Sequence, residues 1–261
     1  MKQVWVTSLD KDPAVVGSLL ATIRQYGLAA EGHFWTDDLG KIAWKGALDR
    51  IVDPAVAVWV VVGGSKPVAA SVGFGLTLLA LSAAQQRRQG PVLVWLDRTG
   101  KMTAAQLPMP FQGAEILPLT APTLGAKLVA AAHRPPAAAP PLPYRLGVHA
   151  HEGYGTWLEV GPIDASWAGS LVGVAPEGKI VFQGVGPAGQ LPQKAVLEYP
   201  EQGLTLCLGE TEYSAWAVRN EITPADSHYV KIDGAPASLL FGPYAAGDVA
   251  EVFVMQTACI P

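Results

Sequence analysis

The segment Ala55–Val62 constrains the fold of this chain more than any other feature of the sequence. It reads AVAVWVVV and is apolar at every position. Valine and tryptophan favour extended backbone, and a strand that is apolar on both faces must be covered on both. Strands of this kind occur inside parallel sheets that carry helices on either side. We therefore expect the flanking sequence to supply those helices.

Short apolar runs alternate with stretches of helical spacing around this strand. Asp12 and Pro13 predict a helix start, with aspartate as N-cap and proline in the first turn, and Gly27 predicts the helix end. Residues 68–84 carry no charge, but they fall short of the roughly 20 residues that cross a membrane, so we expect a buried helix. The expected strands are 4–9, 33–35, 55–62, 92–96 and 116–119, and the later expected helices are 39–51, 68–89 and 124–132. Right-handed crossovers and a parallel sheet of five strands follow.

A run of proline and alanine then interrupts the sequence. Residues 135–143 read PPAAAPPLP, which predicts an extended, polyproline-like linker because proline neither donates to a sheet nor continues a helix. Beyond it the hydrophobic period becomes two, in short runs broken by Gly, Pro and Asp. We expect an α/β domain over 1–134, the linker over 135–143, and an all-β domain over 144–261. The β domain should be a sandwich or barrel of about eight to ten strands.

Composition and charge exclude several classes of protein. Half of the residues are hydrophobic and 15% are charged, which excludes a disordered chain. Residues 1–134 carry 13 basic and 9 acidic side chains and residues 135–261 carry 5 and 13, yet neither half has the basic cluster that nucleic-acid binding requires. We expect neither nucleic acid nor membrane as partner and, because no secretory signal is evident, a cytoplasmic location. Cys207 and Cys259 stand singly in apolar segments, so we expect reduced, buried thiols.

Polar residues follow several expected strands at their carboxyl ends, where open parallel sheets bind ligands. They are Ser8, Asp10, Asp37, Asp38 and the segment Gly63-Gly64-Ser65-Lys66. The two glycines let backbone amides approach a phosphate and Lys66 adds positive charge, so the segment is a candidate site for a phosphate or a nucleotide. The segment matches neither common phosphate-loop pattern, and a tight turn also explains it. Helix capping likewise explains Asp37 and Asp38, and a local ion pair explains Asp97 with Arg98.

The order of these segments resembles the Toll/interleukin-1 receptor (TIR) family. The opening VWVTSLDKDPAVVGSLLATIRQYGL is similar to the family's first strand, its loop with serine and aspartate, and its first helix. FWTDDLG, with Trp44 after it, resembles the acidic loop behind the second strand. VAVWVVVGGS resembles the third strand and its turn, and PVLVWL the fourth. Over residues 1–134 the resemblance implies a flavodoxin-like fold and a signalling role through a protein partner or self-association. Residues 144–261 show no family resemblance.

One position departs from that family. Members that cleave NAD use a glutamate in the helix after the third strand, but the segment VAASVGFGLTLLALSAAQQRRQ contains no acidic residue. Thr77 lies about where the glutamate would fall, and threonine has no carboxylate to stabilise an oxocarbenium-like centre. The resemblance therefore implies binding or assembly more than NAD cleavage. An NAD-consuming hydrolase that uses Asp37, Asp38 or Glu31 instead is the alternative hypothesis.

The β domain suggests two further possibilities. His149 and His151 should share one face of a strand, which suits Zn²⁺ or Cu²⁺ if a third ligand comes from elsewhere. Exposed histidines are the alternative explanation. Trp and Tyr residues are spread through the domain, where they predict either core packing or an exposed row that stacks on sugars or contacts a protein. A partner- or carbohydrate-binding protein dominated by this domain is the second alternative function.

Overall fold

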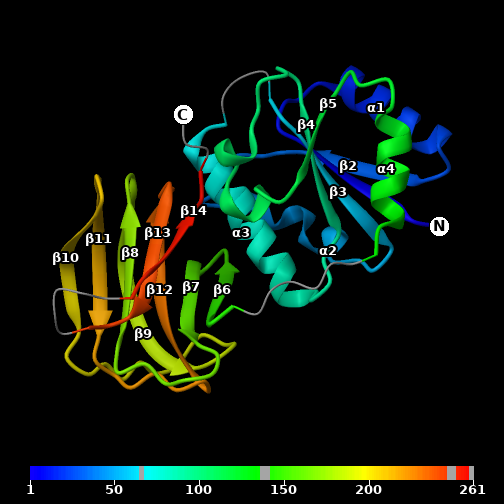
Figure 1. Ribbon diagram of the computed structural model, residues 1–261. Coiled ribbons are helices and arrows are strands. Elements are labelled where there is room, and N and C mark those ends of the chain that lie inside the picture. The colour runs from blue at the N-terminus through cyan, green and yellow to red at the C-terminus, as the bar shows by residue number, and fades with distance from the viewer. Residues whose placement is uncertain (65–67, 136–141, 246–250, 259–261) are drawn as a thin grey trace.

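The computed structural model describes residues 1–64, 68–135, 142–245 and 251–258 (Figure 1). Ser65, Lys66 and Cys259 lie outside these residues. So does most of the expected linker, and its polyproline conformation stays a prediction.

The first half of the chain forms a parallel sheet of five strands with helices on both faces (Figure 1). The strand order is β2-β1-β3-β4-β5, and every neighbouring pair is parallel. Its elements are β1 (Gln3–Ser8), α1 (Pro13–Gln25), β2 (Ala29–Phe34), η1 (Ala43–Ala47), α2 (Leu48–Ile51), β3 (Val56–Val62), α3 (Ala70–Gln86), β4 (Val92–Asp97), η2 (Ala104–Gln106), η3 (Met109–Phe111), β5 (Glu115–Pro118) and α4 (Leu124–His133). The order reverses between β1 and β3, and doubly wound sheets bind ligands beyond the carboxyl ends of such strands.

The central strand β3 is covered on both faces, as its sequence predicts. Val58 and Val60 pack in one cluster with α1 and α4. Trp59 and Val61 point the other way and pack in a second cluster with α3. The N-terminus of α1 is also as expected, because Asp12 Oδ1 accepts a hydrogen bond from the backbone N–H of Val15 at 3.2 Å.

The expected helix over 39–51 is wrong in its first half. Residues Ala43–Ala47 form the 3₁₀ helix η1, and only Leu48–Ile51 is α-helical. Ile42 adopts the left-handed backbone conformation, with φ of 53°, which interrupts any helix that approaches from Leu39. Trp44 and Leu48 are nevertheless buried, so apolar side chains of this segment reach the core although its backbone is not one continuous α-helix.

The second half of the chain forms two antiparallel sheets (Figure 1). The five-stranded sheet has the order β10-β11-β8-β13-β14 and the four-stranded sheet the order β6-β7-β12-β9. Their strands are β6 (Tyr144–His151), β7 (Gly155–Pro162), β8 (Ser170–Ala175), β9 (Gly178–Pro187), β10 (Glu201–Leu208), β11 (Thr211–Val218), β12 (Asp226–Gly234), β13 (Ser238–Pro243) and β14 (Phe253–Gln256). Val172 of one sheet and Leu158 and Val230 of the other share one core. The nine strands in the described residues agree with the period of two.

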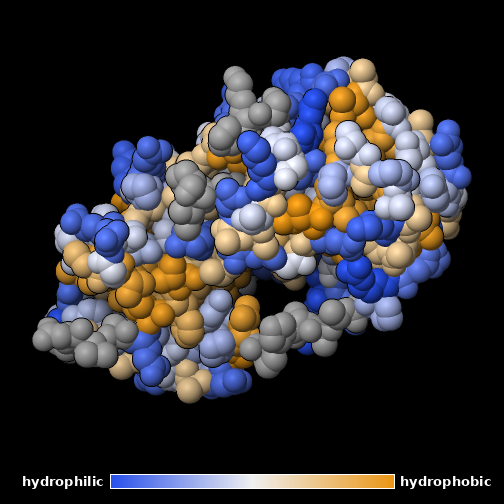
Figure 2. Space-filling model, turned by 45° about the horizontal axis from the view of Figure 1, so that its top comes forward, coloured by the Kyte–Doolittle hydropathy of each residue, from blue (hydrophilic) through white to orange (hydrophobic). Residues whose placement is uncertain are grey.

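The five-stranded sheet is apolar on its outer face as well. Leu171, Ala175 and Leu240 form a cluster there, separate from the core between the sheets. Figure 2 shows hydrophobic residues gathered on this part of the β domain. Cys207 lies on the edge strand β10 and is exposed, so the expected burial of this thiol is wrong. Period-two patterning does not distinguish an edge strand from a central one.

Helix α3 joins the two domains. All residues from Gly73 to Leu79 are buried, which is almost two turns of helix with no exposed side. One side packs on the parallel sheet, and the other meets β6 and the residues after β14. This explains why the segment carries no charge, because a helix that is apolar all round is a buried one. No helix in the described residues is long and apolar enough to cross a membrane.

Polar side chains of the α/β domain also hold the free edge of β6. Gln85 Oε1 accepts a hydrogen bond from the backbone N–H of Val148 at 2.9 Å. Lys45 Nζ donates to the carbonyl oxygen of Ala150 at 3.1 Å. Unpaired edge strands tend to associate with other chains, so these two contacts protect the edge while they join the domains.

Gly73 provides a test of this junction. A Cβ at position 73 would stand 2.8 Å from Cα of Ala258 and 2.9 Å from the carbonyl oxygen of Thr257. We expect Gly73→Ala to lower the free energy of unfolding by about 1–3 kcal/mol, the usual cost of overpacking. Chemical denaturation followed by circular dichroism measures this change.

The matched control is Gly17→Ala in α1, where nothing lies within 4 Å of the added Cβ. There the higher helix propensity of alanine acts alone and should raise the free energy of unfolding by up to about 1 kcal/mol. A stabilising effect at both positions would contradict the described packing of α3 against residues 257–258.

Candidate functional site

Ser8 and Asp10 lie together at the carboxyl end of β1, where the strand order reverses. Ser8 is buried, and its Oγ donates to the carbonyl oxygen of Asp10 at 2.8 Å. Asp10 and Asp12 both pair with Arg98 beyond β4, with N–O distances of 3.3 Å. The expected local pair of Asp97 with Arg98 is therefore wrong. Arg98 instead ties the loop after β1 to the loop after β4.

Asp97 organises its own loop. Its Oδ1 accepts hydrogen bonds from the backbone N–H and hydroxyl of Thr99 at 2.7 and 2.8 Å, and its Oδ2 accepts one from the N–H of Met102 at 2.8 Å. Burial alone would raise the pKa of Asp97, but these hydrogen bonds hold it below its ordinary value. The carboxylate therefore has a structural role at the carboxyl edge.

Asp37 and Asp38 follow β2 but contact different partners. Asp37 Oδ2 accepts a hydrogen bond from Ser71 Oγ, in the first turn of α3, at 2.6 Å. Asp38 Oδ1 accepts one from the N–H of Lys41 at 3.0 Å, which stabilises a turn and does not cap a helix. Glu31, the other proposed substitute carboxylate, is exposed within β2, three residues before the strand ends at Phe34.

The segment Gly63-Gly64-Ser65-Lys66 is described only in its first half. Gly63 N–H donates to the carbonyl oxygen of Leu96 at 2.9 Å. A Cβ on Gly63 would lie 3.0 Å from Trp95 Nε1 and 3.2 Å from that same oxygen. Close packing of β3 on β4 therefore accounts for this glycine without a ligand. Since Ser65 and Lys66 lie outside the described residues, the phosphate contact stays a prediction.

Thr77 is fully buried. Its Oγ1 lies 3.0 Å from the carbonyl oxygen of Gly73 and 3.2 Å from that of Thr257, both of which are acceptors. The side chain thus faces the residues that follow β14. A ligand reaches Thr77 only if these residues move away.

A polar cluster that sequence reasoning missed centres on Glu159 of β7. Glu159 is only 1% exposed. Its Oε2 contacts His149 Nε2 at 2.7 Å, and its Oε1 accepts from Ser227 Oγ and Gly189 N–H, each at 2.8 Å, and lies 3.1 Å from Arg145 Nε. Burial alone would raise the pKa of Glu159, but the hydrogen bonds from His149, Gly189 and Ser227 lower it below its ordinary value. In the sequence, this cluster is indicated by the single acidic residue within the otherwise uncharged segment TWLEVGP.

His149 and His151 lie two residues apart on β6, as expected, but their contacts differ. His149 Nε2 is held by Glu159, and because an ionised carboxylate only accepts, this nitrogen carries hydrogen. His151 Nδ1 accepts from the N–H of Gly153 at 3.3 Å. His228 is buried between Ser170 and Gln183, and burial lowers its pKa to about 3. The described residues contain no group of three or more metal-ligating side chains.

The loop after β9 covers part of the Glu159 cluster. The hydroxyl of Tyr229 donates to the carbonyl oxygen of Pro187 and accepts from the N–H of Gln190 at 3.2 Å. Burial and the charge of Glu159 raise the pKa of Tyr229 to about 12. Tyr229 therefore stays a neutral hydrogen-bonding group that fastens the loop to the sheet.

Aromatic side chains are exposed elsewhere on the four-stranded sheet. The rings of Trp157 and Phe182 meet edge to face with their centroids 5.6 Å apart, and Trp157 Nε1 donates to the carbonyl oxygen of Tyr154 at 3.0 Å. Phe182 is 55% and Tyr154 66% exposed. We call Tyr154, Trp157 and Phe182 the aromatic patch. Exposed clusters of large apolar side chains mark sites of interaction, so this patch is a candidate recognition surface.

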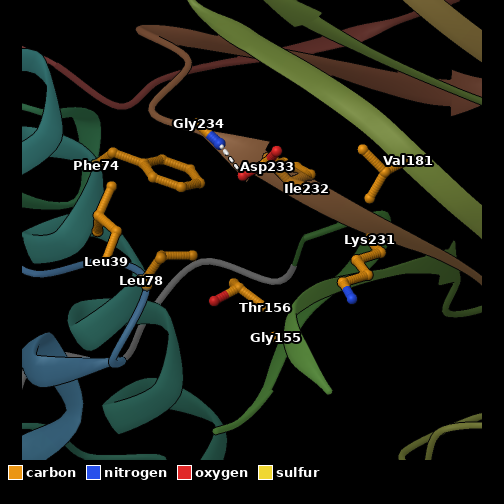
Figure 3. Close-up of a pocket in the computed structure, with 11 residues that line it drawn as sticks. Leu39, Phe74, Leu78, Gly155, Thr156, Val181, Lys231, Ile232, Asp233 and Gly234 are labelled. Carbon is orange, nitrogen blue, oxygen red and sulfur yellow. Dashed lines mark hydrogen bonds between the residues drawn. The ribbon is translucent and has the colours of Figure 1, made fainter. Parts of the chain in front are cut away.

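A cleft of about 360 Å³ lies between the domains beside this patch (Figure 3). Leu39, Phe74 and Leu78 of the α/β domain form an apolar wall, and β12 faces them with Lys231 and Asp233. Lys231 pairs in register with both Trp157 and Phe182, so the cleft and the aromatic patch are contiguous. Ligand sites occur preferentially at such domain interfaces.

No protein-family model matches this chain, and no curated protein matches it either. The resemblance to the TIR family therefore depends on the order and spacing of the segments in the first half. For the β domain, the functional interpretation rests on the contacts and the exposure of its side chains.

Glu159 makes the polar cluster sensitive to acid. Because its pKa is lower in the folded chain than its ordinary 4.5, its stabilising contribution is complete above pH 4.5 and is lost as the pH falls through the folded value. We expect Glu159→Gln to lower the free energy of unfolding at pH 7 by about 3 kcal/mol, since it leaves Arg145 without its ion-pair partner. The variant should also lose less stability than the wild type below pH 4.5.

Urea denaturation between pH 7 and pH 3 tests both expectations. Glu152→Gln, at an exposed glutamate of the same domain, is the control and should follow the wild type. The same acid response in all three proteins would show that Glu159 is not the group responsible.

Proposed function

We propose that this protein is a TIR-like signalling or interaction protein that acts by binding. This proposal rests on the burial of Thr77. The helix that supplies the catalytic glutamate in NAD-cleaving relatives of this type lacks an acidic residue, and the corresponding side chain is bonded to Thr257 of the β domain. A carboxylate at this position would be enclosed between the domains, where its charge is costly and substrate has no access.

The strand order supports the TIR-like part of the proposal. The order β2-β1-β3-β4-β5 is that of flavodoxin-like sheets, the fold that the resemblance implies. A nucleotide at the carboxyl ends of β1 and β3 belongs to the same proposal, with Lys66 as its expected phosphate contact. Ser8, Asp37 and Asp38 are engaged in bonds within the chain, so they would serve such a ligand only after rearrangement.

Incubation of the purified protein with NAD, with nicotinamide release and melting temperature followed together, tests this proposal. We expect no release above the protein-free blank. If a nucleotide binds, the melting temperature rises with NAD concentration by mass action. Lys66→Ala should then abolish the rise, while Lys194→Ala, at an exposed lysine of the β domain, should retain it.

Two other results count against the proposal. Nicotinamide release that Asp37→Ala abolishes would make the protein an NAD-consuming enzyme with a substitute carboxylate. Release that survives replacement of Asp37, Asp38 and Glu31 together would place an active site elsewhere in the chain.

The aromatic patch favours a second candidate function, recognition of a carbohydrate or a protein by the β domain. Aromatic faces stack on sugar rings and anchor protein interfaces. Polar side chains next to the patch can orient a ligand. Lys231 of β12 lies between Trp157 of β7 and Phe182 of β9, and the centroid of the His151 ring lies 5.7 Å from that of the Tyr154 ring. Both an apolar platform and hydrogen-bonding groups are therefore present on one surface.

Titration with soluble oligosaccharides, followed by tryptophan fluorescence, tests the carbohydrate form of this function. We expect saturable changes, and Phe182→Ala should weaken binding at least about fivefold, the loss of about 1 kcal/mol that marks an interface anchor. Tyr199→Ala is the matched control, because Tyr199 is 76% exposed but lies outside the patch. Absence of any saturable change leaves a protein partner or a second copy as the ligand of this surface.

A further inference from the structure

A second recess between the domains, of about 270 Å³, lies near the Glu159 cluster. Its α/β wall comes from η1, α2 and the last turns of α3, and its β wall comes from β6 and Gly189. The polar lining residues are Lys45, Ser82, Gln85, Gln86 and His149. None of the described residues that line the recess is acidic, Lys45 carries a positive charge, and the Glu159 carboxylate behind His149 is paired with Arg145.

Two polar groups on this lining have no hydrogen-bond partner in the described residues. Ser82 is 5% exposed and its hydroxyl makes no hydrogen bond there. The indole N–H of Trp44, a residue 1% exposed, is likewise unpaired. Nearly all buried polar groups in proteins are hydrogen-bonded. The Ser82 hydroxyl is therefore available to donate to a ligand with acceptor atoms, whereas the indole N–H of Trp44 is one of four unpaired tryptophan N–H groups in the described part of the same core.

Lys45 supplies the charge that selects such a ligand, and His149 adds a ring nitrogen to the lining. Lys45 forms no ion pair with a described residue, and its Nζ donates only to Ala150, which leaves two of three hydrogens available. Glu159 holds Nε2 of His149 and leaves Nδ1 without a partner in the described part of the chain. In the protonated ring Nδ1–H is a donor to such a ligand.

We propose that this recess binds a small anion, either a carboxylate or a phosphate, with Lys45 as its charged contact and Ser82 and the His149 ring as further contacts. Glu159 orients the His149 ring from behind and acts as a positioning residue. The recess uses neither the carboxyl edge of the parallel sheet nor the aromatic patch, so this site is independent of the function proposed above. Because both domains line it, a bound anion would also strengthen their junction.

Titration of the full chain, labelled with ¹⁵N in its histidine rings, with inorganic phosphate and with succinate tests the site. We expect a saturable shift of the His149 ring signals, which the His149→Gln spectrum assigns. Succinamide, which is uncharged, should cause no such shift. Saturation with phosphate alone assigns a phosphate ligand, whereas saturation with succinate assigns a carboxylate.

Variants decide whether the recess itself is responsible. Lys45→Met should weaken binding at least about tenfold, as expected for the loss of one charge-assisted hydrogen bond, and Ser82→Ala should weaken it severalfold. Lys41→Met is the matched control, because Lys41 is an exposed lysine four residues earlier that pairs with Asp38 and does not line the recess. Melting curves confirm that each variant is folded.

Two results would overturn the proposal. One is the absence of a saturable His149 shift with both anions. The other is equal weakening by Lys41→Met and Lys45→Met, which would show only general attraction of anions to a positive surface.

Discussion

The rest of the structure depends on the burial of α3 between two unlike layers. On one side the helix covers the parallel sheet, and on the other it fills the side of the β domain between β6 and the residues after β14. A charged residue on any face would have entered an apolar interface, where an unpaired charge is strongly unfavourable. Apolar burial, with hydrogen bonds from Gln85 and Thr77, makes one continuous core from two domains.

This junction determines where ligands can reach the α/β domain. The position that resembles a catalytic one, Thr77, lies inside the junction and is closed to solvent. The carboxyl edge is held together by Arg98, which joins two loops, and by Asp97, which fixes the backbone that follows β4. The charged side chains of this edge therefore have partners within the chain and hold its loops together.

The buried carboxylate of Glu159 has a similar role in the β domain. Four donors surround it, and together they hold β6, β12 and the loop after β9 on one face of the sheet. The His149 ring that it orients lines a recess against α3, and the half-buried Trp157 of β7 and the exposed Phe182 of β9 lie on either side of β12. The candidate surfaces of this protein are therefore concentrated where the four-stranded sheet approaches the α/β domain.

Local patterns in the sequence determined much of the architecture. The all-apolar β3, the capped α1 and the change to a period of two predicted a parallel sheet followed by antiparallel ones, because burial on one or both faces sets hydrophobic spacing. The same patterns failed at residues 39–42, where the left-handed Ile42 interrupts a plausible helix. Only the tertiary structure decided that the β domain covers the second side of α3, that Arg98 reaches Asp10 and Asp12, and that His149 meets Glu159. These contacts join residues far apart in the chain, and hydrophobic spacing specifies which face is buried but not which partner covers it.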